Sequence, residues 1–195
     1  MREVTIERNT NETQIELTLN LDGAGRYQVD TGCGFLNHML ELFARHGRFD
    51  LVLTCHATWR WIITTPPRMW ASRWGSVRPG AGRYAGHPPV RQLLSAHGRS
   101  PHPLRRGHLG PLHPELGHPL QHRKVGDFDV ECTKEFWLGF ARSVPATVHF
   151  VQFAGENSHH ILEAAFKGAG RALADAVRID AAHRDEIPST KGLLV

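Results

Sequence analysis

Residues 155–167 read Gly-Glu-Asn-Ser-His-His-Ile-Leu-Glu-Ala-Ala-Phe-Lys, a stretch that combines a helix start with two adjacent imidazoles and a carboxylate. The Asn-Ser pair is a natural N-cap. In the helix that follows, His159 and Glu163 are four residues apart and His160 and Glu163 three apart, so the three head groups share one face. Two adjacent histidines diverge by about 100° around a helix axis, so they suit two metal ions better than one.

The alternative interpretation is that these are solvated polar residues at a helix start. Apolar side chains flank them, at Ile161, Leu162 and Phe166, and leave little room for a strip that faces only solvent. The motif by itself therefore suggests a metal site without establishing one.

Length and cysteine content set the broad class. A chain of 195 residues can form one sizeable core or two small halves. It contains no signal-like apolar run and no apolar stretch of the roughly 18 residues that a membrane span needs. Cys33, Cys55 and Cys132 are odd in number and lack metal-type spacing. We therefore expect a cytoplasmic protein with reduced thiols and no membrane partner.

The charge is distributed unevenly. Residues 57–123 contain ten arginines, no lysine, no aspartate and one glutamate, a net charge of +9, whereas the whole chain carries +4 and the remainder therefore −5. The same segment holds ten of the twelve prolines and four of the five tryptophans. Taken at face value, this composition favours an acidic partner such as nucleic acid.

On either side of this segment the sequence has regular periodicity. Residues 4–8, 13–19, 27–30 and 49–55 are typical of strands, and residues 35–46 have helical spacing with Gly47 as a C-cap. After the segment, residues 128–131 and 147–153 predict strands, Thr133 is expected to cap a helix over 134–142, and a last helix runs to about residue 177. Within the segment, proline recurs too often for a helix or an inner strand.

Several short stretches carry a resemblance: Asn11-Glu12-Thr13, Thr-Gly-Cys-Gly-Phe-Leu-Asn-His-Met-Leu at 31–40, His46-Gly47, Lys-Val-Gly-Asp-Phe at 124–128, Gly-Glu-Asn-Ser-His-His at 155–160, and Pro-Ser-Thr-Lys-Gly at 188–192. In combination they resemble the imidazoleglycerol-phosphate dehydratases of histidine biosynthesis, over residues 1–56 and 124–195. Asn37 stands where the family usually has aspartate. This departure concerns a contact to His38 rather than the metal site itself.

The family's other metal motif, His-His-Thr-x-Glu-Asp, should follow His56 and is absent. Reading each codon from the third base of one residue and the first two of the next restores it. Trp61-Ile62 then forces aspartate, Met69-Trp70 valine and Trp70-Ala71 glycine. With permitted choices at the free bases, residues 57–76 read Asp-Met-Glu-Val-Asp-His-His-His-Thr-x-Glu-Asp-Val-Gly-Ile-Ala-Leu-Gly-Gln.

A second shift of the reading frame is found further along the segment. Starting at the second base, residues 87–93 can include Arg-Tyr-Gly and residues 108–112 can include Ser-Gly-Arg, which resemble family stretches that hold substrate arginines. The frame returns at about Lys124. We therefore predict three parts: the start of a first half-domain at 1–56, an out-of-frame segment at 57–123, and a second half-domain at 124–195.

The resemblance implies roles for particular residues. The metal ligands would be His38, His149, His159, His160 and Glu163, holding two Mn²⁺ ions that make the substrate's imidazole an electron sink. Catalytic proton transfer would use Glu12 and Glu163. The residues that bind the small phosphorylated imidazole substrate would be Glu12, Lys167, Ser189 and Lys191. Taken singly, His38 is typical of a core histidine, His149 of a strand's surface, Ser189 of a turn and Lys191 of a mobile tail.

The expected fold is α+β, built as two similar halves, each a four-stranded sheet backed by helices. The repeat is suggested by the pairing of His38 with the hidden His-His motif, against His149 with His159-His160. The family resemblance also implies a homo-oligomer, a 24-subunit shell with metals at subunit interfaces.

Two other classes remain open. One is a basic nucleic-acid-binding module that uses residues 57–123, and its basic residues vanish if the segment is out of frame. The other is a metal-binding relic whose centre no longer supports catalysis. With the segment out of frame, the favoured reading is a dehydratase that binds no nucleic acid and that the written segment impairs.

Overall fold

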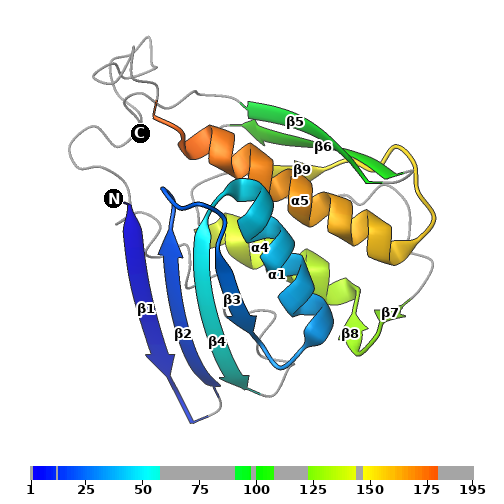
Figure 1. The fold of residues 1–195 in the computed structure, drawn as a ribbon. Coiled ribbons are helices and arrows are strands. Elements are labelled where there is room, and N and C mark those ends of the chain that lie inside the picture. Colours follow the sequence, from blue (N-terminus) through cyan, green and yellow to red (C-terminus); the bar gives the residue numbers. More distant parts are fainter. Residues whose placement is uncertain are drawn as a thin grey trace.

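The computed structural model describes residues 2–11, 13–57, 91–97, 100–107, 123–143 and 147–179 (Figure 1). Its elements, in chain order, are β1 (Glu3–Asn9), β2 (Thr13–Asn20), β3 (Tyr27–Asp30), α1 (Gly34–Gly47), β4 (Asp50–Ala57), β5 (Arg91–His97), β6 (Ser100–Gly107), β7 (Lys124–Val125), β8 (Phe128–Asp129), α4 (Glu131–Ser143), β9 (Thr147–Phe150) and α5 (Ser158–Val177).

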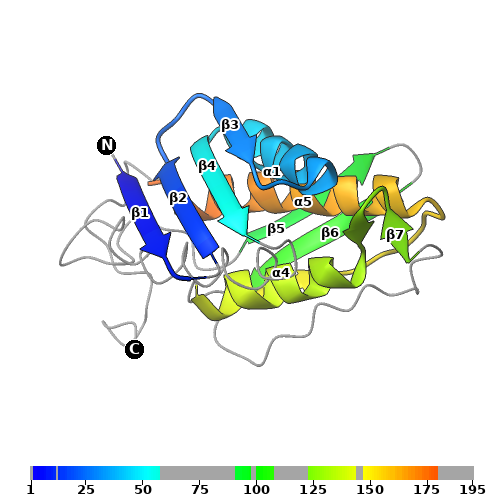
Figure 2. The same ribbon diagram turned by 90° about the horizontal axis from the view of Figure 1, so that it is seen from below.

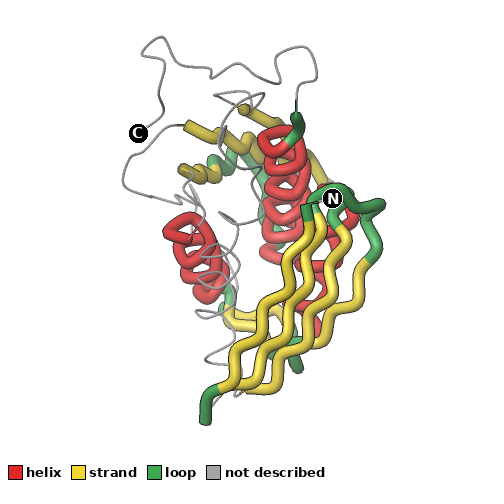
Figure 3. The backbone as a smooth tube through the Cα atoms, turned by 90° about the vertical axis from the view of Figure 1, so that its left-hand side faces the viewer, coloured by secondary structure: helices red, strands yellow, loops and turns green. Residues whose placement is uncertain are grey.

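The first sheet has the strand order β1-β2-β4-β3 and forms one twisted layer (Figure 3). β1, β2 and β4 are antiparallel neighbours, and β3 runs parallel to β4. The period-two pattern of β2 is borne out, since Ile15 and Leu17 are buried while Gln14 and Glu16 are exposed. One face of the sheet therefore packs on the core, and helix α1 joins that core through Met39 and other buried side chains.

The second half repeats this order of elements. β5, β6 and β9 form an antiparallel sheet in that spatial order, as β1, β2 and β4 do. In each half a helix directly precedes the strand that pairs with the second strand: α1 precedes β4, and α4 precedes β9. The α+β class and the repeated halves are thus confirmed. In the described residues the second sheet has three strands instead of four, and β7 pairs with β8 as a separate ribbon.

The expectations for residues 100–107 and for the start of the helix after β8 were wrong. Residues 100–107 form the central strand β6 despite Pro101 and Pro103. β6 pairs with β9 only over 104–107, so at both prolines the described sheet has a neighbour on one side alone, as at the edge positions where strands tolerate proline. Helix α4 begins at Glu131, before Thr133, because the Asp129 carboxylate accepts a hydrogen bond from the Glu131 backbone N–H at 3.2 Å.

Helices α1 and α5 pack side by side, α1 against the first sheet and α5 against β5 and β6 (Figures 1 and 2). Helix α4 joins them through an aromatic cluster centred on Trp137, whose ring centroid lies 6.2 Å from that of Phe43 on α1 and 5.0 Å from that of Phe166 on α5. No helix among the described residues is long and apolar enough to cross a membrane.

The two helices meet at a glycine crossing. A Cβ added at Gly170 would lie 2.5 Å from the Phe43 carbonyl oxygen and 3.1 Å from the Gly47 nitrogen. Gly47 was predicted as the C-cap, but it lies inside α1, and Arg48 takes the left-handed conformation at φ 56°. Glycine is thus needed here for close approach of two backbones.

We expect Gly170→Ala to destabilise the full-length protein by about 1–3 kcal/mol, because the new methyl group forces the two helices apart. This range is the net effect: the steric cost of a Cβ 2.5 Å from a backbone oxygen is larger, and the gain of about 1 kcal/mol that alanine brings in a helix interior offsets part of it. Urea unfolding measures the difference. Gly34→Ala is the control, since a Cβ at this α1 position meets nothing within 4 Å. Equal stability of the two variants would contradict the crossing.

Candidate metal and substrate site

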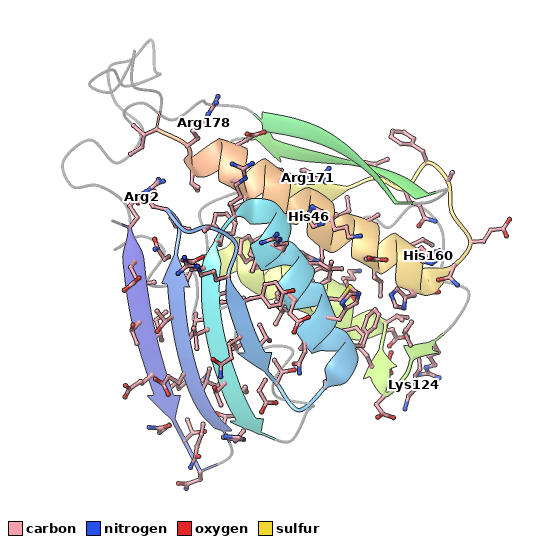
Figure 4. All side chains as sticks on the ribbon, viewed as in Figure 1. Arg2, His46, Lys124, His160, Arg171 and Arg178 are labelled. Atoms are coloured by element: carbon pink, nitrogen blue, oxygen red, sulfur yellow. The ribbon has the colours of Figure 1, made fainter. Side chains whose placement is uncertain are left out.

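Polar side chains line the seam between α1 and α5. Helix α5 carries four of them at four-residue intervals, which we call the α5 stripe: His159, Glu163, Lys167 and Arg171. This spacing places them on one face of the helix. Helix α1 contributes His38 and His46, eight residues apart. His38 lies near His159. His46 lies near Arg171 (Figure 4), so the two helices run in the same direction along the seam.

The start of the seam brings histidines from both helices together. The ring centroids of His38 and His159 are 5.9 Å apart. The ring of Phe35 lies edge-on to His159 at 5.2 Å and packs against Phe128 at the same centroid distance. The packing of Phe35 against both Phe128 and His159 restricts the position of the His159 imidazole.

Glu163 is the buried centre of the stripe, with 8 % of its surface exposed. Its Oε1 accepts from the Lys167 ammonium at 2.6 Å, and its Oε2 lies 3.9 Å from Nε2 of His159. Lys167 is nearly as enclosed as Glu163. A buried carboxylate needs such a cationic partner to remain ionised, so Lys167 keeps Glu163 available as an anion.

The start of α5 orients the two adjacent histidines. The side chain of Asn157 accepts a hydrogen bond from the His160 backbone N–H at 3.1 Å, which confirms the predicted N-cap. The rings of His159 and His160 lie 5.9 Å apart at 70° to each other. His160 is exposed while His159 is half-buried, so the two imidazoles face different surroundings.

Not every predicted site residue joins this group. His149 lies half-buried on β9. Among the described residues, no three histidine, cysteine, aspartate or glutamate side chains are grouped as a metal site requires. Glu12, Ser189 and Lys191 lie outside the described residues, as does the stretch after residue 57 where the hidden motif is predicted.

The donor types nevertheless suit the ion that the family resemblance implies. Imidazole nitrogens and a carboxylate are accepted together by Mn²⁺. His38 with His159, and His159 with Glu163, supply neighbouring donors from two packed helices. The described residues therefore fit part of a Mn²⁺ shell, and a complete shell needs further ligands.

The contact between His46 and Arg171, at the end of the seam away from His159, was not predicted from the sequence. Nη2 of Arg171 lies 3.1 Å from Nδ1 of His46. Burial lowers the pKa of His46 below its usual value, and the charges of Arg171 and Lys167 lower it further, against the opposing charge of Glu163. The four-residue spacing from His159 to Arg171 was visible in the sequence. The sequence did not show which residue of α1 would face Arg171.

Asn37 has a clear structural role. Its Oδ1 accepts from the Thr31 backbone N–H at 2.9 Å and from the Thr31 hydroxyl at 2.5 Å. These bonds close the loop that leads into α1 and so help to place His38, the next residue. Aspartate would offer the same acceptor, so asparagine keeps this function of the position.

Comparisons with known proteins point to one family. A sequence profile described as Imidazoleglycerol-phosphate dehydratase matches residues 111–173. An imidazoleglycerol-phosphate dehydratase of Azorhizobium caulinodans is 39% identical over 100% of this chain and 99% of its own length, and one of Desulforamulus reducens is 40% identical over 99% and 98%.

Solved structures are similar as well. The crystal structure of imidazoleglycerol-phosphate dehydratase from Staphylococcus aureus matches 91% of this chain and 99% of its own, with a TM-score of 0.77 and 22% identity. The Pyrococcus furiosus enzyme in complex with (S)-C348 matches 97% and 100%, with a TM-score of 0.72 and 26% identity. With the full-length identity of the relatives above, these matches show that the chain belongs to the imidazoleglycerol-phosphate dehydratase family.

Proposed function

We propose that this protein is a hydro-lyase that dehydrates imidazoleglycerol phosphate to imidazoleacetol phosphate in histidine biosynthesis, with two Mn²⁺ ions. The observation that carries the proposal is the α5 stripe facing His38, in a chain of this family. The reaction removes a proton from a carbon that is not acidic by itself and expels a hydroxyl group as water. It therefore needs an electron sink, a base and an anchor for the phosphate.

The residues of the seam support such a division of roles. When bound, Mn²⁺ would act as a Lewis acid on the substrate's ring nitrogens. Its ligands would be His38, His149, His159, His160 and Glu163. A carboxylate, Glu12 or Glu163, would accept the proton. Because Oε1 of Glu163 is engaged by Lys167, Oε2 is the oxygen on the side of His159.

The phosphate would be held by cationic and hydroxyl groups. Lys167 ends in the seam, and Ser189 and Lys191 would join it from the C-terminal stretch. An ammonium shared between a carboxylate and a phosphate couples substrate binding to the position of Glu163. The arginines of the predicted Arg-Tyr-Gly and Ser-Gly-Arg stretches would complete this clamp.

The proposal includes the reading frame. Residues 57–123 are taken to be out of frame, so the chain as written is impaired. We call the chain with the in-frame reading of this segment the repaired chain. Both seam helices lie outside the segment, so each site variant can be made in either chain.

His160→Ala in the repaired chain tests the metal mechanism. We expect Mn²⁺-dependent turnover to be lost while α5 stays formed, since alanine is a better helix former than histidine. Turnover with and without a chelator, and circular dichroism for the helix, are the measurements. His56→Ala, which removes an exposed histidine of β4, is the control and should remain active. Full activity of the His160 variant after chelation would remove the metal mechanism.

A further inference from the structure

We propose that Arg171 is a positioning residue: its hydrogen bond to His46 fixes the tautomer of that histidine, and its charge directs the Lys167 ammonium onto Glu163. Its effect on catalysis rests on the function proposed above. The hydrogen bond and its consequence for His46 rest on the geometry alone.

The tautomer follows from donor and acceptor chemistry. A guanidinium only donates hydrogen bonds, so Nδ1 of His46, 3.1 Å from Nη2 of Arg171, must be the acceptor. His46 is then neutral, with its proton on Nε2. Protonation at Nδ1 would set an N–H group against a cation and break the bond.

The effect on Lys167 follows from charge along the stripe. Arg171 lies one helical turn beyond Lys167, and Glu163 lies one turn before it. Like charges four residues apart on a helix repel, and opposite charges attract. The Lys167 ammonium is therefore driven away from Arg171 and toward Glu163, where it is found at 2.6 Å.

The position of the pair makes this arrangement rigid. His46 and Arg171 are the chain neighbours of Gly47 and Gly170, the glycines of the helix crossing. The two backbones are too close there to slide without a clash. The hydrogen bond beside this contact joins an exposed arginine to a half-buried histidine, and the close approach of the two glycines fixes the spacing of the backbones that carry them.

Four charged groups change the pKa of His46, and a test must distinguish their separate effects. Arg171 and Lys167 from α5 and Arg45 from α1 all disfavour its protonation, and Glu163 favours it. Arg45 thus offers a matched control. It is a cation near His46, but the hydrogen bond to Nδ1 comes from Arg171.

The first experiment is nitrogen NMR of the His46 ring in the full chain as written, and again in the repaired chain, across a pH series. We expect the Nε2–H tautomer in the unmodified chains. Arg171→Lys, which keeps a charged donor, should preserve it. Arg171→Ala should give a mixture of tautomers and raise the pKa of His46, while Arg45→Gln should raise the pKa and leave the tautomer unchanged. An Nδ1–H tautomer in the unmodified chains, or no change in Arg171→Ala, would overturn the inference.

The second experiment measures kinetics in the repaired chain. Arg171→Ala should raise KM by about tenfold with a smaller change in kcat, because the displaced group, Lys167, holds the substrate. Arg171→Lys should restore KM, and Arg45→Gln should not change it. Unchanged KM in Arg171→Ala would overturn the role in catalysis. If the repaired chain has no dehydratase activity at all, the proposed function fails, and the tautomer experiment still decides the role of Arg171.

Discussion

The chain as written should bind Mn²⁺ weakly at most and show no dehydratase activity. The repaired chain should recover both Mn²⁺ binding and dehydratase activity. The surviving ligands come from one His-His-x-x-Glu set, together with His38 and His149. In the function proposed above, the second set and two phosphate arginines are encoded only in the shifted frames of residues 57–123. Each ion would therefore keep part of its shell, and one ion alone cannot hold both ring nitrogens of the substrate.

The described residues supply only neighbouring pairs of donors. His38, His159 and Glu163 approach one another in pairs, but the described residues group no three such donors as a metal site requires. An incomplete shell binds weakly because each missing ligand is replaced by water at the ion. We expect the loss in activity to exceed about a thousandfold, since electrostatic stabilisation of the developing charge is the largest single contribution to such catalysis.

Titration calorimetry with Mn²⁺ and an assay of imidazoleacetol phosphate formation, run on both chains, measure this difference. Resequencing the gene across residues 56–124 is the direct companion test. The repaired chain carrying His160→Ala, in which α5 should stay formed, separates recovery of the site from recovery of the fold. If the chain as written turned over substrate at the rate of the repaired chain, either the frame argument or the two-metal mechanism would have to be abandoned.

Sequence reasoning located α5 well because its signals are local. Asn157 caps the helix, His159 and Glu163 are four residues apart, and the helix ends at Val177 as expected. It misplaced the start of α4 because Asp129, and not Thr133, supplies the capping oxygen. Both residues are good N-caps, and only the tertiary position of the helix distinguishes them.

Contacts between segments that are distant in the chain could not be predicted from the sequence. The bond between His46 and Arg171 joins residues 125 positions apart, and it depends on the close approach at Gly47 and Gly170. The strand β6 was rejected because of its prolines, yet the register with β9 leaves those positions with a neighbour on one side. In both cases the packing of a neighbouring element decided the outcome, and single-segment patterns do not contain that information.

Glu163→Gln in the repaired chain should abolish dehydratase activity and also destabilise the fold. The substitution removes the charge that pairs with Lys167 in an enclosed site. Breaking a buried ion pair by neutralising one partner costs about 3 kcal/mol or more; glutamine keeps an oxygen as acceptor, so we expect the lower end. The loss of activity has a separate cause, because an amide is a poor ligand for Mn²⁺ and cannot accept a proton as a carboxylate does.

A second substitution separates the two effects. Glu163→Gln combined with Lys167→Met removes both charges, and a long apolar side chain replaces the ammonium. Replacing a whole buried pair is often neutral or stabilising, so urea unfolding should show most of the lost stability regained. Activity should remain absent, because the carboxylate is still missing and the phosphate has lost its lysine. If the double variant recovered turnover along with stability, Glu163 would be a structural residue of the seam, and the ligand and base of the reaction would have to lie elsewhere.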